Sequence, residues 1–268
     1  MRGELSGTDG PGIPRLIRVA AVGDIHIGRD TPGFTPHQLE GLEGSAHLLL
    51  IAGDLTQHGH ADEAAALARE LEHAPVPVIA VLGNHDYHHG EQDRIRKQLE
   101  RAGVIVLEGE GTVMSIDGVR VGIAGTKGFG GGFAGACGSE FGEEEMKLFI
   151  RSTRTKADEL TLALERLDCD LRIALTHYAP VKGTLAGERL EIFPFLGSYL
   201  LGEAVDKTGC TVAFHGHAHA GTERAVTAAG VAVRNVARPV IKLAYKVYTF
   251  DAAGAPVRTE ASVGLKSA

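Results

Sequence analysis

The sequence contains few cysteines and no long apolar run. Its three cysteines, Cys137, Cys169 and Cys210, are scattered and odd in number, so neither a disulfide framework nor a C-x-x-C zinc or redox pair is indicated. No apolar stretch approaches the roughly 20 residues that a membrane-spanning helix needs. The first residues lack the basic start and apolar stretch of a secretory signal. We therefore expect a cytoplasmic protein in a reducing compartment, without a membrane partner.

Positive charge is also scarce, with 27 Lys+Arg against 34 Asp+Glu and a formal net charge of -7. This balance argues against nucleic acid as a partner, because binding to its backbone usually needs a basic surface. It does not exclude a phosphate ligand, since bound metal ions can reverse the local charge. The 268 residues are 44% hydrophobic, enough for a sizeable core. We expect a flexible tail over residues 1–14 and a single domain over residues 15–268.

Five short apolar runs each lead into residues of the types that bind metal ions. Continuous apolar runs of about four to eight residues are typical of buried strands. Open sheets place their functional sites where such strands end. The runs cover 16–22, 47–52, 76–82, 171–176 and 211–214, and they lead into Asp24 and His26, Asp54, Asn84 with His85 and Asp86, His177, and His217 with His219.

The segments between and after these runs predict a mixed α/β fold. Amphipathic helices alternate with the first strands, as in α/β proteins whose helices cover a sheet. Later in the chain, short strands joined by turns indicate hairpins, one of them with Asp117-Gly118 at its turn. We therefore expect a mixed β-sandwich with helices outside. The expected helices span 61–72, 92–101 and 142–167, and the expected hairpins span 112–125, 222–236 and 243–259.

A glycine-rich segment, residues 128–138, lies between a predicted strand and a predicted helix. It lacks the G-x-x-x-x-G-K-[ST] pattern of phosphate-binding loops. A mobile surface loop is the favoured interpretation, and a lid over the substrate is the alternative.

The clusters at the strand ends combine carboxylate, imidazole and amide ligands. Each block by itself is also ordinary turn material, so the argument depends on the whole set. A mixed set of nitrogen and oxygen ligands suits manganese, iron, zinc or similar ions. Two such ions can share a hydroxide nucleophile and stabilise an in-line displacement at phosphorus. Their charge would exceed that of Asp24 and Asp54, so an acidic protein can bind an anion here.

In this order, the blocks D-x-H, G-D, G-N-H-D, H and G-H-x-H resemble the calcineurin-like metallophosphoesterase superfamily. GDLT and GNHD are similar to its cyclic-nucleotide-phosphodiesterase-like branch. The resemblance implies a four-layer αββα sandwich with two mixed β-sheets and flanking helices. It also implies two divalent or mixed-valence metal ions (Mn, Fe, Zn or similar). The ligands implied are Asp24, His26, Asp54 and His219 for the first ion and Asp54, Asn84, His177 and His217 for the second, with Asp54 bridging.

The resemblance gives His85 a catalytic role in place of a ligand role. An imidazole there would stabilise the transition state or give a proton to the leaving oxygen. Asp86 could orient it, an expectation that rests on adjacency alone. Gln57 stands where relatives frequently carry an aspartate, which leaves the partner of His85 open. The second block also lacks the arginine of the protein serine/threonine phosphatases, so that subclass is not expected.

The expected function is that of a metal-dependent phosphoesterase. It would hydrolyse a small phosphodiester or phosphomonoester, a nucleotide being one option, by attack of a metal-bound hydroxide. One alternative is a nuclease of the same superfamily, which a basic groove would favour. Another is a non-catalytic scaffold, which should have lost metal ligands, whereas none of the seven is missing. The native metals, the physiological substrate and the oligomeric state are not indicated.

Overall fold

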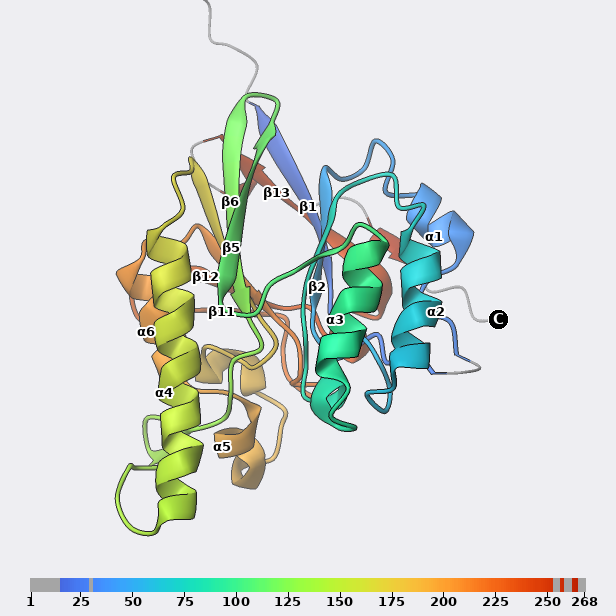
Figure 1. Cartoon of the computed structure of the whole chain (residues 1–268). Helices are drawn as coiled ribbons and strands as arrows, with labels where there is room; N and C mark the ends of the chain where they lie inside the picture. Colours follow the sequence, from blue (N-terminus) through green and yellow to red (C-terminus); the bar gives the residue numbers. More distant parts are fainter. Residues whose placement is uncertain (1–14, 29–30, 253–255, 258–261, 265–268) are drawn as a thin grey trace, which may run out of the picture.

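The structure, a computed structural model, describes residues 15–28, 31–252, 256–257 and 262–264 (Figure 1). The predicted N-terminal tail lies outside the described residues, and so does part of the predicted hairpin at 243–259. No helix of the described part of the chain is both long enough and apolar enough to cross a membrane.

The first sheet contains the strands nearest the N-terminus. Four parallel strands follow one another in chain order, and an antiparallel strand from the C-terminal region pairs with the first of them. The second of these parallel strands is buried along its whole length, as its leucine-rich sequence predicts. The strands are β1 (Leu16–Val22), β2 (Leu48–Ala52), β3 (Val78–Val81), β4 (Ile105–Val106), β13 (Leu243–Asp251), β14 (Pro256–Val257) and β15 (Ser262–Gly264).

The second sheet has four parallel strands and an antiparallel strand at each edge, in the order β11-β12-β10-β9-β6-β5. The predicted hairpins at 112–125 and 222–236 form these edges and are confirmed. Asp117 and Gly118 both have positive φ, 50° and 77°, as a two-residue hairpin turn requires. The strands are β5 (Glu110–Ile116), β6 (Val119–Thr126), β9 (Leu171–Thr176), β10 (Val212–His215), β11 (Arg224–Val226) and β12 (Ala232–Asn235).

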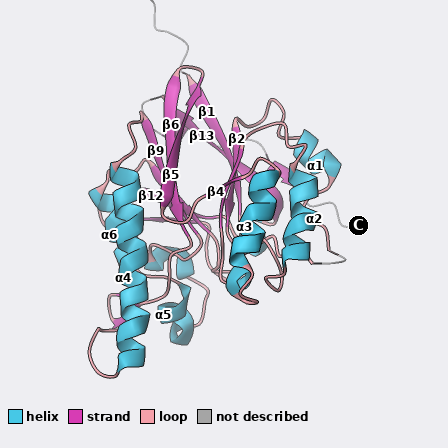
Figure 2. Cartoon of the chain, viewed as in Figure 1, coloured by secondary structure: helices cyan, strands magenta, loops and turns pink. Residues whose placement is uncertain are grey.

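Helices cover the outer face of each sheet, so the four-layer sandwich is confirmed (Figures 1 and 2). The three predicted helices correspond to α2, α3 and α4. Beside the first sheet lie α1 (Pro36–Glu40), α2 (Ala61–Leu71) and α3 (Gln92–Arg101), and beside the second lie α4 (Glu144–Glu165) and α6 (Tyr199–Lys207). The short helices are η1 (His85–Tyr87), η2 (Lys182–Leu185), η3 (Leu190–Ile192), α5 (Phe193–Leu196) and α7 (Arg238–Ile241).

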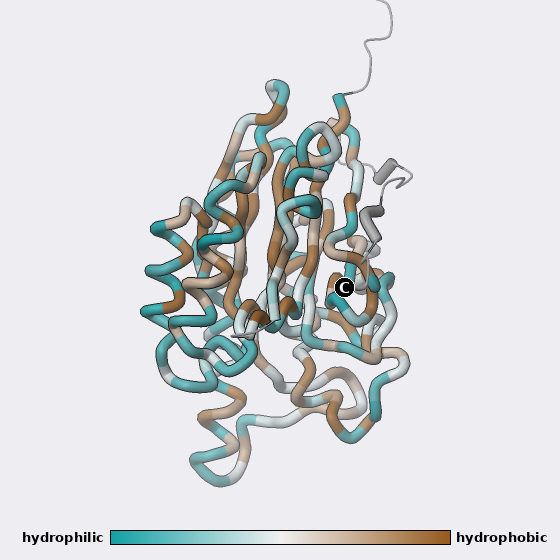
Figure 3. Tube along the Cα trace, turned by 90° about the vertical axis from the view of Figure 1, so that its right-hand side faces the viewer, coloured by the Kyte–Doolittle hydropathy of each residue, from teal (hydrophilic) through white to brown (hydrophobic). Residues whose placement is uncertain are grey.

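The main hydrophobic core lies between the two sheets. Leu50 of the first sheet and Phe214 of the second are fully buried in the same cluster. A second cluster, with Leu160 and Leu201, fills the space between the second sheet and its helices. Figure 3 shows the apolar residues concentrated along the strands. Burial of this core holds the strand ends, and the loops that follow them, in fixed positions.

The glycine-rich segment differs from the expected mobile surface loop. Residues 134–137 are exposed, but residues 130–133 are buried, and β7 (Gly132–Phe133) pairs with β8 (Ala136–Cys137). The Gly131 and Gly132 N–H groups donate to the carbonyls of Pro194 and Gly197, at 2.6 and 2.9 Å. The segment therefore anchors α5 and the residue that follows it to the short β7–β8 hairpin.

Candidate metal centre

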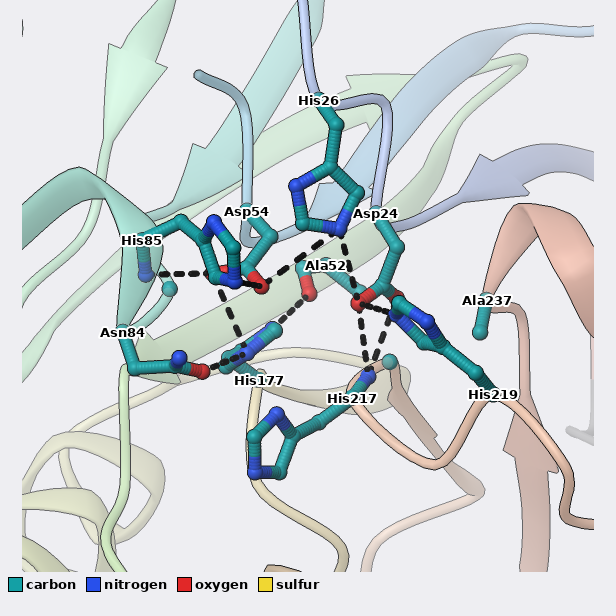
Figure 4. Close-up of polar contacts among 12 residues, drawn as sticks. Asp24, His26, Ala52, Asp54, Asn84, His85, His177, His217, His219 and Ala237 are labelled. Atoms are coloured by element: carbon teal, nitrogen blue, oxygen red, sulfur yellow. Dashed lines mark hydrogen bonds and ion pairs between the residues drawn. The ribbon is translucent and has the colours of Figure 1, made fainter. Parts of the chain in front are cut away.

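The predicted ligands converge at one edge of the sandwich, beyond the carboxyl ends of the parallel strands. Figure 4 shows their side chains pointing toward one another from loops of both sheets. The first sheet contributes the loops after β1, β2 and β3, and the second contributes those after β9 and β10. The residues brought together are Asp24, His26, Asp54, Asn84, His85, His177, His217 and His219.

The backbone at this edge is strained. Six described residues other than glycine have positive φ, and four of them are predicted ligands. A left-handed conformation costs a non-glycine residue roughly 1–3 kcal/mol, and such strain is typical of functional sites. These four residues are Asp24, His26, Asp54 and His217, with φ of 58°, 50°, 50° and 69°.

Two motif glycines allow the ligand loops to pack closely. A Cβ atom at Gly83 would overlap the carboxylate and backbone of Asp54. A Cβ atom at Gly216 would overlap the carboxylate of Asp24. The glycines of G-N-H-D and G-H-x-H are thus required by the close approach of neighbouring ligands.

Asp24, His26 and His219 form the first group whose ligand atoms could hold a metal ion. His219 Nε2 lies 2.8 Å from Asp24 Oδ1, and His26 Nε2 lies 3.9 Å from the same oxygen. His26 Nε2 is buried and has no hydrogen-bond partner among the described residues. A buried imidazole nitrogen without a partner is costly, and a metal ion would satisfy it.

Asp54, His177 and His217 form a second such group. The Nδ1–H of His177 donates to the carbonyl of Ala52 at 2.9 Å, which leaves the Nε2 lone pair free. Nε2 lies 2.9 Å from Asn84 Oδ1 and 3.3 Å from Asp54 Oδ1. One nitrogen and two oxygen acceptors therefore face a common point, which a cation would stabilise.

The charges of the centre also fit a metal site. Asp24 and Asp54 are 3% and 1% exposed, and neither forms an ion pair with a lysine or arginine in the described residues. Burial and the neighbouring negative charges of Asp24 and Asp86 raise the pKa of Asp54. Burial lowers the pKa of His26 to about 4 and that of His217 to about 3, so both rings are neutral at pH 7. These two neutral imidazoles are ready to bind a cation, and a cation would displace the proton that burial favours on Asp54.

His85 lies at the open side of the centre, with 43% of its side chain exposed. Its Nε2 is 3.9 Å from Asp54 Oδ2, and its Nδ1–H donates to the backbone carbonyl of Gln57 at 2.7 Å. With His26 and Asp54 it forms a third group of possible ligands. The carbonyl of Gln57 thus orients the ring, and the side chain at that position is not needed for this contact.

Asp86 is fully buried and makes its hydrogen bonds elsewhere. Its carboxylate accepts from the N–H groups of Leu55, Thr56 and Gly83 at 3.2, 2.8 and 2.7 Å, and from the Thr56 hydroxyl at 2.6 Å. It therefore joins the loop after β2 to the loop after β3. This geometry differs from the expectation that Asp86 orients His85.

Asp86→Ala should lower the free energy of unfolding of the metal-free protein by about 3 kcal/mol or more, because three backbone N–H groups would lose a buried acceptor. Chemical denaturation measures this change. Asp168→Ala, at a 90% exposed carboxylate, is the matched control and should change stability little. A large loss of kcat with unchanged stability would instead support a role in orienting His85.

His215 has a structural role. It is fully buried, and its ring contacts Gly216 O and Thr184 Oγ1, both at 2.8 Å. It therefore ties the loop after β10 to η2. His60 and His89, which are also outside the predicted set, lie with their ring centroids 4.0 Å apart.

The chain belongs to the calcineurin-like phosphoesterase family, whose model matches residues 17–221. Among solved structures it is similar to phosphopantetheinyl hydrolase from Mycobacterium tuberculosis, with 16% identity, a TM-score of 0.57, and coverage of 84% of this chain and 90% of that one. It is also similar to TT1561 of Thermus thermophilus, with 16% identity, a TM-score of 0.53, and coverage of 91% and 98%. At these identities the similarity shows the fold. No curated protein matches the sequence.

Proposed function

We propose that this chain hydrolyses a small phosphodiester or phosphomonoester with the help of two divalent metal ions. The observation that carries the proposal is the convergence of seven potential ligands from loops of both sheets. Asp54 belongs both to the group with His177 and His217 and to the group with His26 and His85. The family supports phosphoester hydrolysis, and the neutral imidazoles and buried carboxylates support metal binding.

In this proposal Asp24, His26, Asp54 and His219 hold one ion, and Asp54, Asn84, His177 and His217 hold the other. The ions, when bound, would supply a nucleophile at neutral pH and neutralise charge on the phosphoryl oxygens. Asp54 would serve both ions, because its Oδ2 lies 3.7 Å from His26 Nε2 and its Oδ1 lies 3.3 Å from His177 Nε2. His85, on the open side, is placed to give a proton to the leaving oxygen.

A non-catalytic scaffold is the less favoured alternative. Such a protein would have no need to keep strained backbone at Asp24, Asp54 and His217, nor to leave His26 Nε2 buried and unpartnered. The seven potential ligands are all present and close together, which favours an enzyme.

Metal-stripped protein should be inactive toward bis-p-nitrophenyl phosphate and p-nitrophenyl phosphate and should regain turnover when manganese is added. Elemental analysis should find about two ions per chain after reconstitution. The ratio of diester to monoester turnover would define the substrate class. A protein that binds no metal would contradict the proposal, and one that binds two ions without hydrolysing either ester would favour a scaffold.

A further inference from the structure

Lys127 lies beside the second group of ligands. Thr126 at the end of β6 pairs with Thr176 at the end of β9, so Lys127 and His177 leave the second sheet at the same edge. The N–H groups of His177 and Tyr178 both donate to the Lys127 carbonyl at 3.1 Å. The backbone of Lys127 is therefore fixed directly next to a predicted ligand.

Three aromatic rings surround the amino group of Lys127. Its Nζ lies 4.7 Å from the centroid of Tyr87, 5.0 Å from Phe129 and 5.6 Å from Tyr178. Tyr87 is two residues after His85, and Tyr178 directly follows His177 and lies 4.5 Å, ring to ring, from His217. The side chain thus extends from the second sheet toward the loop of the first sheet that carries Asn84 and His85, along one side of the centre.

The positive charge of Lys127 has no close partner. Among the residues that the structure describes, its amino group makes no hydrogen bond and no ion pair. The nearest compensating charges act at longer range, from Glu108 and Asp54. Burial lowers the pKa of Lys127, which indicates that its charge is partly removed from water. A buried lysine with a purely structural role would be expected to donate hydrogen bonds to a carboxylate or a carbonyl. The amino group of Lys127 instead contacts the faces of aromatic rings.

We propose that Lys127 is a specificity residue that binds a second phosphate group of the substrate, next to the ester that is cleaved. This inference rests on the proposed function. Two bound divalent ions less Asp24 and Asp54 would leave a charge of +2, which a hydroxide and the single negative charge of a phosphodiester would neutralise, so the positive charge of Lys127 would remain for another anionic group. A further phosphate would supply the acceptor that the amino group lacks.

Two chromogenic substrates that differ by one phosphate test this role. They are the p-nitrophenyl ester of thymidine 5′-phosphate and the same ester with a 3′-phosphate. The manganese-loaded wild type should prefer the 3′-phosphorylated ester by about 10- to 100-fold in kcat/KM, mainly through KM. In Lys127→Met the ratio of the two kcat/KM values should fall to near one. Lys127→Arg, which keeps the positive charge, should retain part of the preference.

Binding gives a readout that does not depend on turnover. By calorimetry, wild type should bind thymidine 3′,5′-bisphosphate about 10-fold or more tightly than thymidine 5′-phosphate, and Lys127→Met should bind both alike. Lys207→Met is the matched control, because Lys207 is 67% exposed, pairs with Glu165, and lies at the end of α6 that precedes β10, away from the centre. It should keep the wild-type preference.

Three outcomes would overturn the proposal for Lys127. The first is a wild type that does not prefer the 3′-phosphorylated ester, and the second is a Lys127→Met variant that keeps the wild-type preference. The third is an equal loss of affinity for both nucleotides in Lys127→Met together with a lower melting temperature, which would give Lys127 a structural role only. Failure of the proposed function can be distinguished from failure of this inference. In that case the wild type would hydrolyse neither ester, but calorimetry would still report its relative affinity for the two nucleotides.

Discussion

Asp54→Asn is expected to abolish the metal centre. The reconstituted variant should hold fewer than one ion per chain, and its kcat should fall by about 1,000-fold or more, because this carboxylate is proposed to serve both ions and belongs to two of the three groups of potential ligands. The replacement is nearly isosteric, and an amide oxygen can still accept the His85 N–H that donates to Oδ1 at 2.9 Å. Elemental analysis and steady-state kinetics measure the two effects. Retention of two ions would contradict the bridging role.

The same variant should alter how the stability of the metal-free protein depends on pH. Burial and the charges of Asp24 and Asp86 raise the pKa of Asp54 above the 3.8 of a free carboxyl. The folded state then holds a proton that the unfolded state loses, so this group's contribution to stability declines as pH rises above about 4. In Asp54→Asn the free energy of unfolding should therefore decline less steeply with rising pH than in the wild type. Asp168→Asn, at an exposed carboxylate, should leave this pH dependence unchanged.

The fold and the position of the centre could be predicted because each depends on local patterns. Apolar runs such as residues 47–52 are typical of buried strands, and parallel strands bring their carboxyl ends to one edge. Glycine before Asp54 and before Asn84 marks the sharp turn that follows each strand. The resemblance then supplied the ligand set, which adjacency at the sheet edge makes physically reasonable.

Contacts between distant loops could not be predicted in this way. The partner of His85 is a backbone carbonyl, at Gln57, and every residue has a carbonyl, so no side-chain pattern reports it. Asp86 is next to His85 in sequence, yet its carboxylate turns toward Leu55 and Thr56, because buried N–H groups there need an acceptor. Likewise, the glycine-rich segment was expected at the surface because composition does not reveal that Gly131 bonds to Pro194.

Lys127 illustrates the same limit for a charged residue. In the sequence it is a single lysine between a strand and a glycine-rich segment, and most lysines in such positions are solvated. Its proposed role depends on Tyr87 in η1 and on Tyr178 after β9, which come together only in the folded chain.

His85→Ala and Asn84→Ala should separate catalysis from metal binding at adjacent residues. His85→Ala should keep two ions but lower kcat by about 100-fold or more, as expected for loss of a general acid. The loss should be larger for phenyl phosphate than for p-nitrophenyl phosphate, because the poorer leaving group needs the proton more. Asn84→Ala should instead lose the second ion, since its amide oxygen faces His177 at 2.9 Å, and its loss of turnover should be partly recovered at high manganese.

The metal content of the two variants decides whether His85 is a catalytic residue or a metal ligand. His85, His26 and Asp54 are close enough to form a metal site of their own. If His85→Ala lost as much metal as Asn84→Ala, and excess manganese restored both, His85 would be a ligand and the proton would have to come from another group. The 43% exposure of its side chain favours the catalytic role, because it leaves the ring accessible to a leaving group, whereas its bond to Gln57 fits either role.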